Sequence, residues 1–328
     1  MKKTNVILDC DPGIDDALAL MLAVSSPELN LLGITTVSGN VPADTGAENV
    51  LRVLRLMGRL DIPVYEGASK PLVRDYVSAQ DTHGMDGLGE SGISPVQETH
   101  RHSGAVDFIL NTLRQGPVTI LAIGPLTNLA LALRKDRAPF RNLERLISMG
   151  GNFHSFGNCS PVAEYNYWCD PDAAAELYET LDRPIHMVGL DVTRRIVLTP
   201  NILEFMRTLN PGRADFIRKI TRFYFDFHWK QEGIIGCVIN DPLAVAYAVD
   251  PGLCEGQDAY TAVETKGICM GPSVVDARHF WHRPPNSRVL TQTDPLAFMT
   301  LFLSRVFEQD PESIRPVLAR IMVGGDAQ

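Results

Sequence analysis

Four aspartates lie close together near the start of the chain, in the stretch ILDCDPGIDDALAL at residues 7–20. Asp9, Asp11, Asp15 and Asp16 stand between one apolar run at 6–8 and another at 17–20. Two carboxylates about 5 Å apart repel by roughly 3 kcal/mol at an effective dielectric near 20. A hard cation would offset this repulsion, because Ca²⁺ takes about six to eight oxygen ligands and accepts carboxylates in mono- or bidentate form. The spacing therefore indicates a metal site at the edge of a core.

Three other interpretations of the aspartates deserve comparison. Helix capping by Asp15 or Asp16 would satisfy free N–H groups and complement the helix dipole, but it accounts for one or two acids and not for four. An EF-hand is excluded, because the twelfth position from Asp9 is Leu20, where that loop requires a bidentate Glu. A strand followed by Asp-x-Asp also resembles the haloacid-dehalogenase-like phosphatases. Those enzymes carry Thr or Val two residues after the second Asp, where this chain has Gly13.

The elements around the aspartates alternate between strand-like and helix-like runs. Buried parallel strands are apolar on both faces, as these runs are, so the alternation predicts a doubly wound α/β fold with a mostly parallel sheet flanked by helices, a Rossmann-like core. The expected strands are 5–9, 31–38, 62–67, 118–123, 143–149 and 184–190, and the expected helices are 15–26, 43–58, 104–115, 125–135 and 170–181.

The second half of the chain is expected to be different. A Gly-rich loop is expected near 81–95, mostly helix over 200–249, short strands over 258–293, and a last helix over about 295–307. No repeat, low-complexity segment or linker interrupts the sequence, so residues 1–328 are expected to form a single domain.

Ligands of open α/β sheets bind beyond the carboxyl ends of the strands. Polar residues and glycines follow each of the expected strands there: the aspartates after the first, Ser38-Gly39-Asn40 after the second, Gly124 after the run at 118–123, Gly150 after the run at 143–149, and Asp191 after the run at 184–190. These groups are expected to meet at one edge of the sheet.

Composition and charge narrow the class of protein. The net charge of −9 argues against a nucleic-acid-binding surface. The apolar run before Asp9 is too short for a signal peptide, and no run approaches the ~18 apolar residues of a membrane span. Six scattered cysteines without a CxxC pair are typical of reduced thiols, so a cytoplasmic protein without membrane partners is expected.

Six motifs in fixed order identify a closer resemblance. DCDPGIDDALAL, TTVSGN, GPLTNLALAL, MGGN, VAEYN and NDPLAVAY occur in this order between residues 9 and 247. Together they resemble the nucleoside hydrolases, the inosine–uridine-preferring N-ribohydrolases, over nearly the whole chain. The resemblance implies one calcium ion per subunit, hydrolysis of ribonucleosides to free base and ribose in nucleoside salvage or catabolism, and a homodimer or homotetramer.

The resemblance also implies a ligand set. Asp11, Asp16 and Asp241 match metal-binding carboxylates, Asp16 as a bidentate ligand, and the main-chain carbonyl of Ile123 completes the protein ligands. Asp11 is also expected to accept a proton from the attacking water. Asp9 matches no ligand and is expected to hydrogen-bond to loop amides.

Further motif positions match residues that bind the sugar. Asp15 matches the residue at the ribose 2′-hydroxyl, Asn40 the asparagine beside the metal and the water, and Glu164 the residue at the 5′-hydroxyl. The other matches on the ribose side are Met149, Asn158, Asn166 and, through the metal, Asp241.

The leaving-group side departs from the family pattern. Many members have His immediately before the metal-binding Asp-Pro, and this chain has Asn240, which can donate a hydrogen bond but has no titrating proton near neutral pH. His228 is the first candidate for the acid that protonates the base, and His83 is the second. Tyr224, Trp168 and Trp229 are candidates for stacking on the base.

Two rival functions remain at this point. A phosphatase would release phosphate and depend on Mg²⁺, and a nucleoside or ribose sensor would bind without turnover. The intact set of carboxylates favours the hydrolase, because binding alone would not need a base that activates water.

Overall fold

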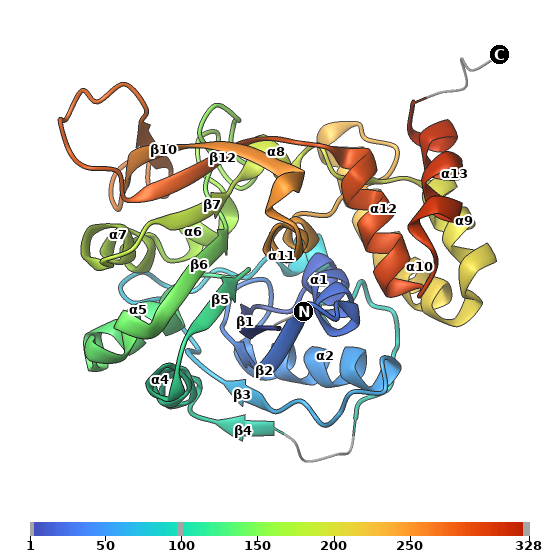
Figure 1. Ribbon diagram of the computed structural model, residues 1–328, viewed down its shortest axis with the longest axis horizontal. Helices are drawn as coiled ribbons and strands as arrows, with labels where there is room; N and C mark the ends of the chain where they lie inside the picture. Colours follow the sequence, from blue (N-terminus) through green and yellow to red (C-terminus); the bar gives the residue numbers. More distant parts are fainter. Residues whose placement is uncertain (1–2, 97–100, 324–328) are drawn as a thin grey trace.

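The structure, a computed structural model, describes residues 3–96 and 101–323. Most of its strands belong to one ten-stranded sheet, and two short strands pair separately (Figure 1). The strands are β1 Thr4–Cys10, β2 Leu29–Thr36, β3 Val64–Glu66, β4 Arg101–Ser103, β5 Val118–Ala122, β6 Leu143–Met149, β7 Ile185–Val188, β8 Val197–Leu198, β9 Cys237–Val238, β10 Cys254–Val263, β11 Ser273–Asp276 and β12 Ser287–Thr293.

The sheet is mostly parallel and doubly wound, as predicted. Its strand order is β11-β10-β12-β7-β6-β5-β1-β2-β3-β4. Among its described strands β10 is the reversed one, antiparallel to both of its neighbours, β11 and β12. The chain proceeds from β1 outward through β2 and β3, then returns to β5 on the other side of β1 and proceeds through β6 and β7. The order therefore reverses between β1 and β5, which is where ligands bind in folds of this class.

Helices cover both faces of the sheet. They are α1 Ile14–Ser25, α2 Ala43–Leu56, α3 Gln80–His83, α4 Ala105–Gln115, α5 Thr127–Lys135, α6 Tyr165–Cys169, α7 Pro171–Thr180, α8 Leu190–Thr193, α9 Pro200–Leu209, α10 Pro211–Glu232, α11 Asp241–Val249, α12 Pro295–Val306 and α13 Pro311–Val323, with 3₁₀ turns at Ala138–Asn142 and Pro251–Leu253.

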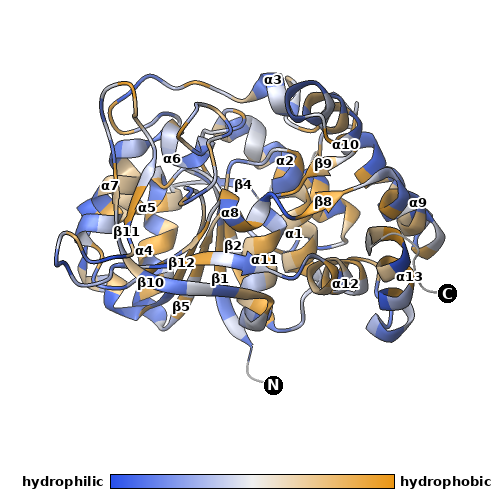
Figure 2. Ribbon diagram, turned by 90° about the horizontal axis from the view of Figure 1, so that it is seen from above, coloured by the Kyte–Doolittle hydropathy of each residue, from blue (hydrophilic) through white to orange (hydrophobic). Residues whose placement is uncertain are grey.

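The buried strand β1 separates two apolar cores because its side chains alternate between faces. Val6 and Leu8 pack with α1, α2, α11 and α12, whereas Ile7 packs with α4, α5 and α7. Figure 1 shows these two groups of helices on opposite sides of the sheet, and Figure 2 shows apolar residues inside and hydrophilic residues on the outer helices. Continuous apolar runs in the central strands follow from this double burial.

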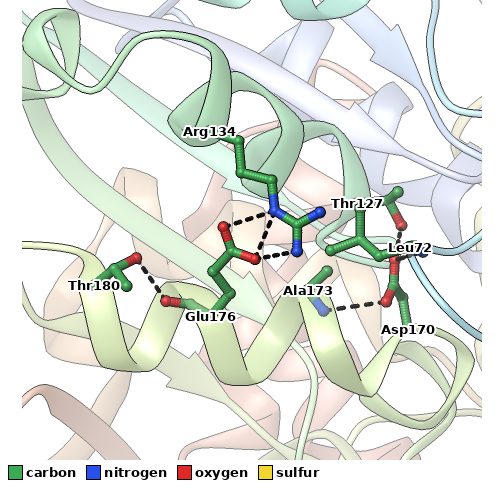
Figure 3. A network of polar contacts seen from close by, with 7 residues as sticks. All are labelled: Leu72, Thr127, Arg134, Asp170, Ala173, Glu176 and Thr180. Atoms are coloured by element: carbon green, nitrogen blue, oxygen red, sulfur yellow. Dashed lines mark hydrogen bonds and ion pairs between the residues drawn. The ribbon is translucent and has the colours of Figure 1, made fainter.

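Polar contacts join α5 to α7 at the periphery of the second core (Figure 3). Arg134 donates from Nε to both Glu176 carboxylate oxygens at 2.8–2.9 Å. The carboxylate of Asp170, which caps α7, accepts from the Thr127 hydroxyl at 2.6 Å and from the Leu72 amide at 2.9 Å. Asp170 is fully buried. Through these hydrogen bonds it connects the loop between β3 and α3, which contains Leu72, with α5 and α7.

The C-terminal region differs from the prediction in one respect. The helix expected over 295–307 is α12, but a further helix, α13, follows it. Pro316 inside α13 removes one helical N–H donor and is atypical of a helix interior, which is why the sequence pattern there is weak. All six cysteines are free, and no helix of residues 3–96 and 101–323 is long and apolar enough to cross a membrane.

Candidate active site

A cavity of about 490 Å³ opens at the carboxyl ends of β1 and β5, the reversal point of the sheet. This volume is typical of pockets that hold small molecules. Eleven of the residues predicted to bind the metal or ribose or to act on the leaving group line it: Asp15, Asn40, His83, Ile123, Met149, Asn158, Glu164, Asn166, His228, Asn240 and Asp241. Asp11 and Asp16 are buried and do not line the cavity wall.

Three carboxylates lie close together at this cavity, and two of them, Asp15 and Asp241, line it. Asp15, Asp16 and Asp241 each place one carboxylate oxygen within 4.8 Å of the others, and all three residues are buried. Burial and then the charge of Asp15 raise the pKa of Asp16 to about 7, and burial and the charges of Asp15 and Asp16 raise the pKa of Asp241. An all-oxygen acidic cluster of this kind suits a hard divalent cation.

Asp11 lies beside this cluster but outside the group of three. Its Oδ2 accepts a hydrogen bond from the Asn40 amide at 2.7 Å, while its buried Oδ1 has no hydrogen-bond partner among the described residues. A buried carboxylate oxygen without a donor is costly unless a cation or water satisfies it. The residues present therefore fit a bound cation.

Two glycines make room for the Asp11 carboxylate. A Cβ at Gly39 would lie 2.0 Å from Asp11 Oδ2, and a Cβ at Gly124 would lie 2.7 Å from Asp11 Oδ1. Any side chain at either position would displace the carboxylate. This close approach explains glycine in SGN and in GPLTN.

Asp16 organises the loop between β1 and α1. Its Oδ2 accepts from the Gly13 amide at 2.9 Å and from Asn40 Nδ2 at 3.0 Å, and its Oδ1 accepts from the Asp11 amide at 3.2 Å. Asn40 thus holds Asp11 through its main chain and Asp16 through its side chain.

The prediction for Asp9 was wrong in its partners. Asp9 Oδ1 accepts from the Thr35 hydroxyl at 2.5 Å and from Asn128 Nδ2 at 2.8 Å, and not from loop amides. Asp9 is the second-last residue of β1, so its side chain points between β2 and α5 instead of into the loop. Burial raises its pKa to about 6.

Asn240 contacts Asp15. Its main-chain amide and its Nδ2 both donate to Asp15 Oδ2 at 3.1 Å, and the Tyr224 hydroxyl reaches the same oxygen at 3.4 Å. Asn240 Oδ1 is buried and accepts no hydrogen bond from residues 3–96 or 101–323. Asn240 therefore fixes the orientation of a cavity carboxylate, in addition to lining the cavity.

Both candidate histidines contact the Tyr224 ring, whose centroid lies 5.2 Å from that of His83 and 4.4 Å from that of His228. His83 Nδ1 accepts from the Ile14 amide at 3.0 Å, which leaves its proton on Nε2. His228 Nδ1 lies 2.9 Å from the Tyr224 carbonyl, an acceptor, so its Nδ1 carries a proton. Burial lowers the pKa of both histidines and favours their neutral forms.

Glu164 and Asn166, which also line the cavity, are held by hydrogen bonds to nearby main-chain groups. Glu164 caps α6 and accepts from the amides of Asn166 at 2.8 Å, Gly151 at 2.9 Å and Tyr167 at 3.2 Å. Asn166 Nδ2 donates to the carbonyls of Ile123 at 3.0 Å and Met149 at 3.1 Å. The Ile123 carbonyl, a predicted metal ligand, thus already accepts one hydrogen bond and retains a second lone pair.

The loop after β6 is fixed by Asp191. The Asp191 carboxylate accepts from three consecutive amides, those of Phe153 and His154 at 2.7 Å and that of Ser155 at 3.0 Å. Asn158 follows in the same loop, and its Oδ1 accepts from the Tyr165 amide at 2.9 Å.

Two of the three aromatic residues predicted to stack on the base lie in the cavity wall. Tyr224 and Trp168 line the cavity, and the guanidinium of Arg74 covers Trp168 at 3.8 Å from the ring centroid. Trp229 is 60% exposed and does not line the cavity, so the structure does not support its stacking on a base.

Sequence reasoning missed several residues of the cavity wall, among them Phe156, Arg194 and Glu232. Arg194 follows β7 at the same carboxyl edge as Asp191, so the stretch DVTRR after that strand carried a signal. Glu232 ends a long helix, and nothing in its local sequence indicates a cavity.

Comparisons with known proteins agree with this geometry. A family model described as "Inosine-uridine preferring nucleoside hydrolase" matches residues 6–300. The pyrimidine-specific ribonucleoside hydrolase RihA of Enterobacter sp. (strain 638) is 37% identical over 305 residues, covering 92% of this chain and 97% of the relative. The solved purine-preferring ribonucleoside hydrolase from Gardnerella vaginalis is 32% identical with a TM-score of 0.87, covering 97% and 100% of the two chains. A plant nucleoside hydrolase, PpNRh1, is also 32% identical with a TM-score of 0.87, covering 93% and 99%.

Proposed function

Because this chain belongs to the inosine-uridine preferring nucleoside hydrolase family, we propose that its cavity binds Ca²⁺ and a ribonucleoside and hydrolyses the N-glycosidic bond. The observation that carries the proposal is the cluster of buried carboxylates, with one unpartnered oxygen on Asp11, at the floor of a cavity the size of a small molecule. Hydrolysis of ribonucleosides to free base and ribose follows from the family, and the calcium and a role in nucleoside salvage are part of the proposal.

Asp11, Asp16, Asp241 and the Ile123 carbonyl are the proposed metal ligands, and Asp15 lies close enough to the same cluster to share in its charge balance. When bound, Ca²⁺ would supply a Lewis acid that orients a water molecule and lowers its pKa. The negative charge of the site favours this ion over a monovalent one.

Asp11 is the proposed general base. Its Oδ2 is held by the Asn40 amide, which leaves Oδ1 free to accept the proton of the attacking water. The water attacks C1′ while the bond to the base breaks, through the oxocarbenium-like transition state common to glycosidases. The buried carboxylates around C1′ stabilise the positive charge that develops on the sugar.

Asp15 is proposed to bind the ribose 2′-hydroxyl. Asn240 and Tyr224 hold its Oδ2, so Oδ1 remains for the substrate. Asn158, Glu164, Asn166 and Met149 lie on the ribose side of the cavity in this proposal.

The base departs on the side of His83 and His228. In its neutral form His83 can donate from Nε2–H to the base, whereas His228 can give up a proton to it only as an imidazolium. Purine or pyrimidine preference is not transferable from the relatives, because their names include both.

Ribose release by the purified protein from a panel of purine and pyrimidine ribonucleosides tests the proposal, with Asp11→Asn as the matched variant. We expect turnover with at least one nucleoside and a large loss in Asp11→Asn with the fold retained. Phosphate release from a phosphomonoester with Mg²⁺ would support the phosphatase, and nucleoside binding without ribose release would support the sensor.

The expectations of a single domain, a cytoplasmic location and a homodimer or homotetramer stay predictions. Sedimentation analysis of the purified protein would test the last of these.

A further inference from the structure

Arg194 brings a positive charge into a cavity whose charged wall is otherwise acidic. It follows α8, its side chain is 17% exposed, and it lines the same cavity as Asp15 and Asp241. Among the described residues that line this cavity, it is the only Lys or Arg. The guanidinium does not titrate in the physiological range, so its charge is fixed.

The Arg194 guanidinium has more N–H donors than its described contacts use. Its Nη2 donates to the Gly157 carbonyl at 3.0 Å, and its Cζ lies 3.8 Å from the centroid of the Phe156 ring. The nearest Glu232 oxygen is 3.6 Å away, an ion pair beyond hydrogen-bond distance. Arg194 Nε is buried and has no hydrogen-bond partner in the part of the chain that the structure describes. A guanidinium has five N–H donors, so most of them remain for another acceptor.

The position of Arg194 places this charge toward the leaving group. Its ion-pair partner Glu232 ends α10, the helix that carries Tyr224 and His228 into the cavity. The carboxylates that would hold the metal and the ribose 2′-hydroxyl come instead from the start of α1 and from α11. The cavity thus has an acidic floor and one cation on the wall shared with α10.

In the proposed reaction, positive charge develops on the sugar and negative charge on the departing base. As water bonds to C1′ and Asp11 takes its proton, the electron pair of the C1′–N bond passes to the base, which leaves as an anion and then takes a proton from solvent. Fixed donors aimed at a developing negative charge are among the largest contributions to catalysis.

We propose that Arg194 stabilises the departing base by a charge-assisted hydrogen bond from its guanidinium to an oxygen or ring nitrogen of the base. This rests on the proposed nucleoside hydrolysis and assigns a leaving-group role to a residue outside the family motifs. Asn240, which replaces the histidine of many members, is occupied with Asp15, so a cation elsewhere in the wall can carry the charge.

Arg194→Met and Arg194→Lys, assayed on two substrates, test the role. We expect Arg194→Met to lower kcat/KM for the best natural nucleoside by on the order of 10²- to 10³-fold. The rate on p-nitrophenyl riboside should stay near that of the parent, because nitrophenolate leaves readily without help. Arg194→Lys should recover part of the loss on the nucleoside, because it keeps the charge but not the fork of donors.

A control variant separates the charge in the cavity from the general effect of losing an arginine that covers a ring. The guanidinium of Arg283 lies 4.9 Å from the centroid of the Tyr260 ring, and Arg283 does not line the cavity, so Arg283→Met should not lower nucleoside hydrolysis appreciably. Equal loss on both substrates in Arg194→Met, or the same loss on the nucleoside in Arg283→Met, would overturn the role, as would an unchanged rate of Arg194→Met on the nucleoside. If the parent protein releases ribose from no nucleoside, the proposed function itself fails, which is a different result from an active parent with an unaffected Arg194→Met.

Discussion

Replacement of Asp191 by Asn should loosen the loop between Gly151 and Asn158 and weaken substrate binding. The Asp191 carboxylate accepts three consecutive loop amides at 2.7–3.0 Å. Asn keeps one oxygen, which can serve two of these amides, and turns its NH₂ group toward the third. One lost charge-assisted hydrogen bond in a half-buried position costs about 2 kcal/mol.

That cost predicts both a stability and a binding effect. A chain of this length gains roughly 0.7 kcal/mol/K of unfolding entropy, so about 2 kcal/mol lowers Tm by about 3 °C. If substrate must reorder the loop that carries Phe156 and Asn158, up to the same free energy is lost from binding. This raises KM by roughly 10- to 30-fold, with kcat much less affected.

Asp276 provides a matched control. Its carboxylate also accepts three loop amides, those of Arg278, Phe280 and Trp281, but the loop follows β11 and does not line the cavity. Thermal unfolding and steady-state kinetics of Asp191→Asn and Asp276→Asn should both show lower Tm, with KM raised only in Asp191→Asn. An unchanged KM in Asp191→Asn, or the same rise in both variants, would refute the reasoning.

Three further predictions concern the metal, the ribose and the pH dependence of stability. Exhaustive chelation should abolish ribose release, and added Ca²⁺ should restore it. The Asp241→Ala variant should bind no Ca²⁺ when measured by calorimetry. Full activity of the chelated protein would contradict the metal site. Asn240→Ala should reduce the preference for ribonucleosides over 2′-deoxyribonucleosides, measured as a ratio of kcat/KM, because Asp15 loses the Nδ2 donor and keeps only the main-chain amide of residue 240. An unchanged ratio would show that Asp15 does not need the side-chain donor. Burial, and then the charges of Arg145 and Arg288, lower the pKa of His186 from 6.5 to about 4. The folded protein therefore binds a proton at His186 less readily than the unfolded chain does. The free energy of unfolding should fall as pH drops from 6.5 to about 4. Urea unfolding of His186→Asn across this range should show a flatter dependence, and an identical pH profile would argue against this cause.

The fold was largely predictable because its signals are local. The apolar runs at 118–123 and 143–149 became β5 and β6, and the helix expected over 125–135 became α5. A central strand that is buried on both faces consists of consecutive apolar residues, so it can be recognised from a short stretch of sequence. The short edge strand β4 and the helix α13 carry weaker patterns, since one is exposed along its length and the other contains Pro316.

The site was predictable in composition but not in its contacts. Asp11 and Asp16 share one motif with the strand that positions them, so their meeting could be foreseen. The hydrogen bonds from Asn240 to Asp15 could not, because they depend on how α11 approaches α1 in three dimensions. Arg194 belongs to no motif, and its place in the cavity depends on the turn after α8 and on the end of α10.

The distance along the chain between the two halves of the acid cluster has a consequence for biosynthesis. Asp15 and its partner Asn240 are 225 residues apart in sequence, and Asp241 lies beside Asn240. A nascent chain that has not yet exposed α11 to its surroundings lacks Asp241, so the proposed site for a divalent cation is still incomplete. A ligand that bridges both halves binds the folded chain alone, and at 100 times its Kd it adds about 2.7 kcal/mol to the free energy of unfolding. Protection from proteases by such a ligand would therefore extend to the whole sheet, because no fragment of the chain could retain it.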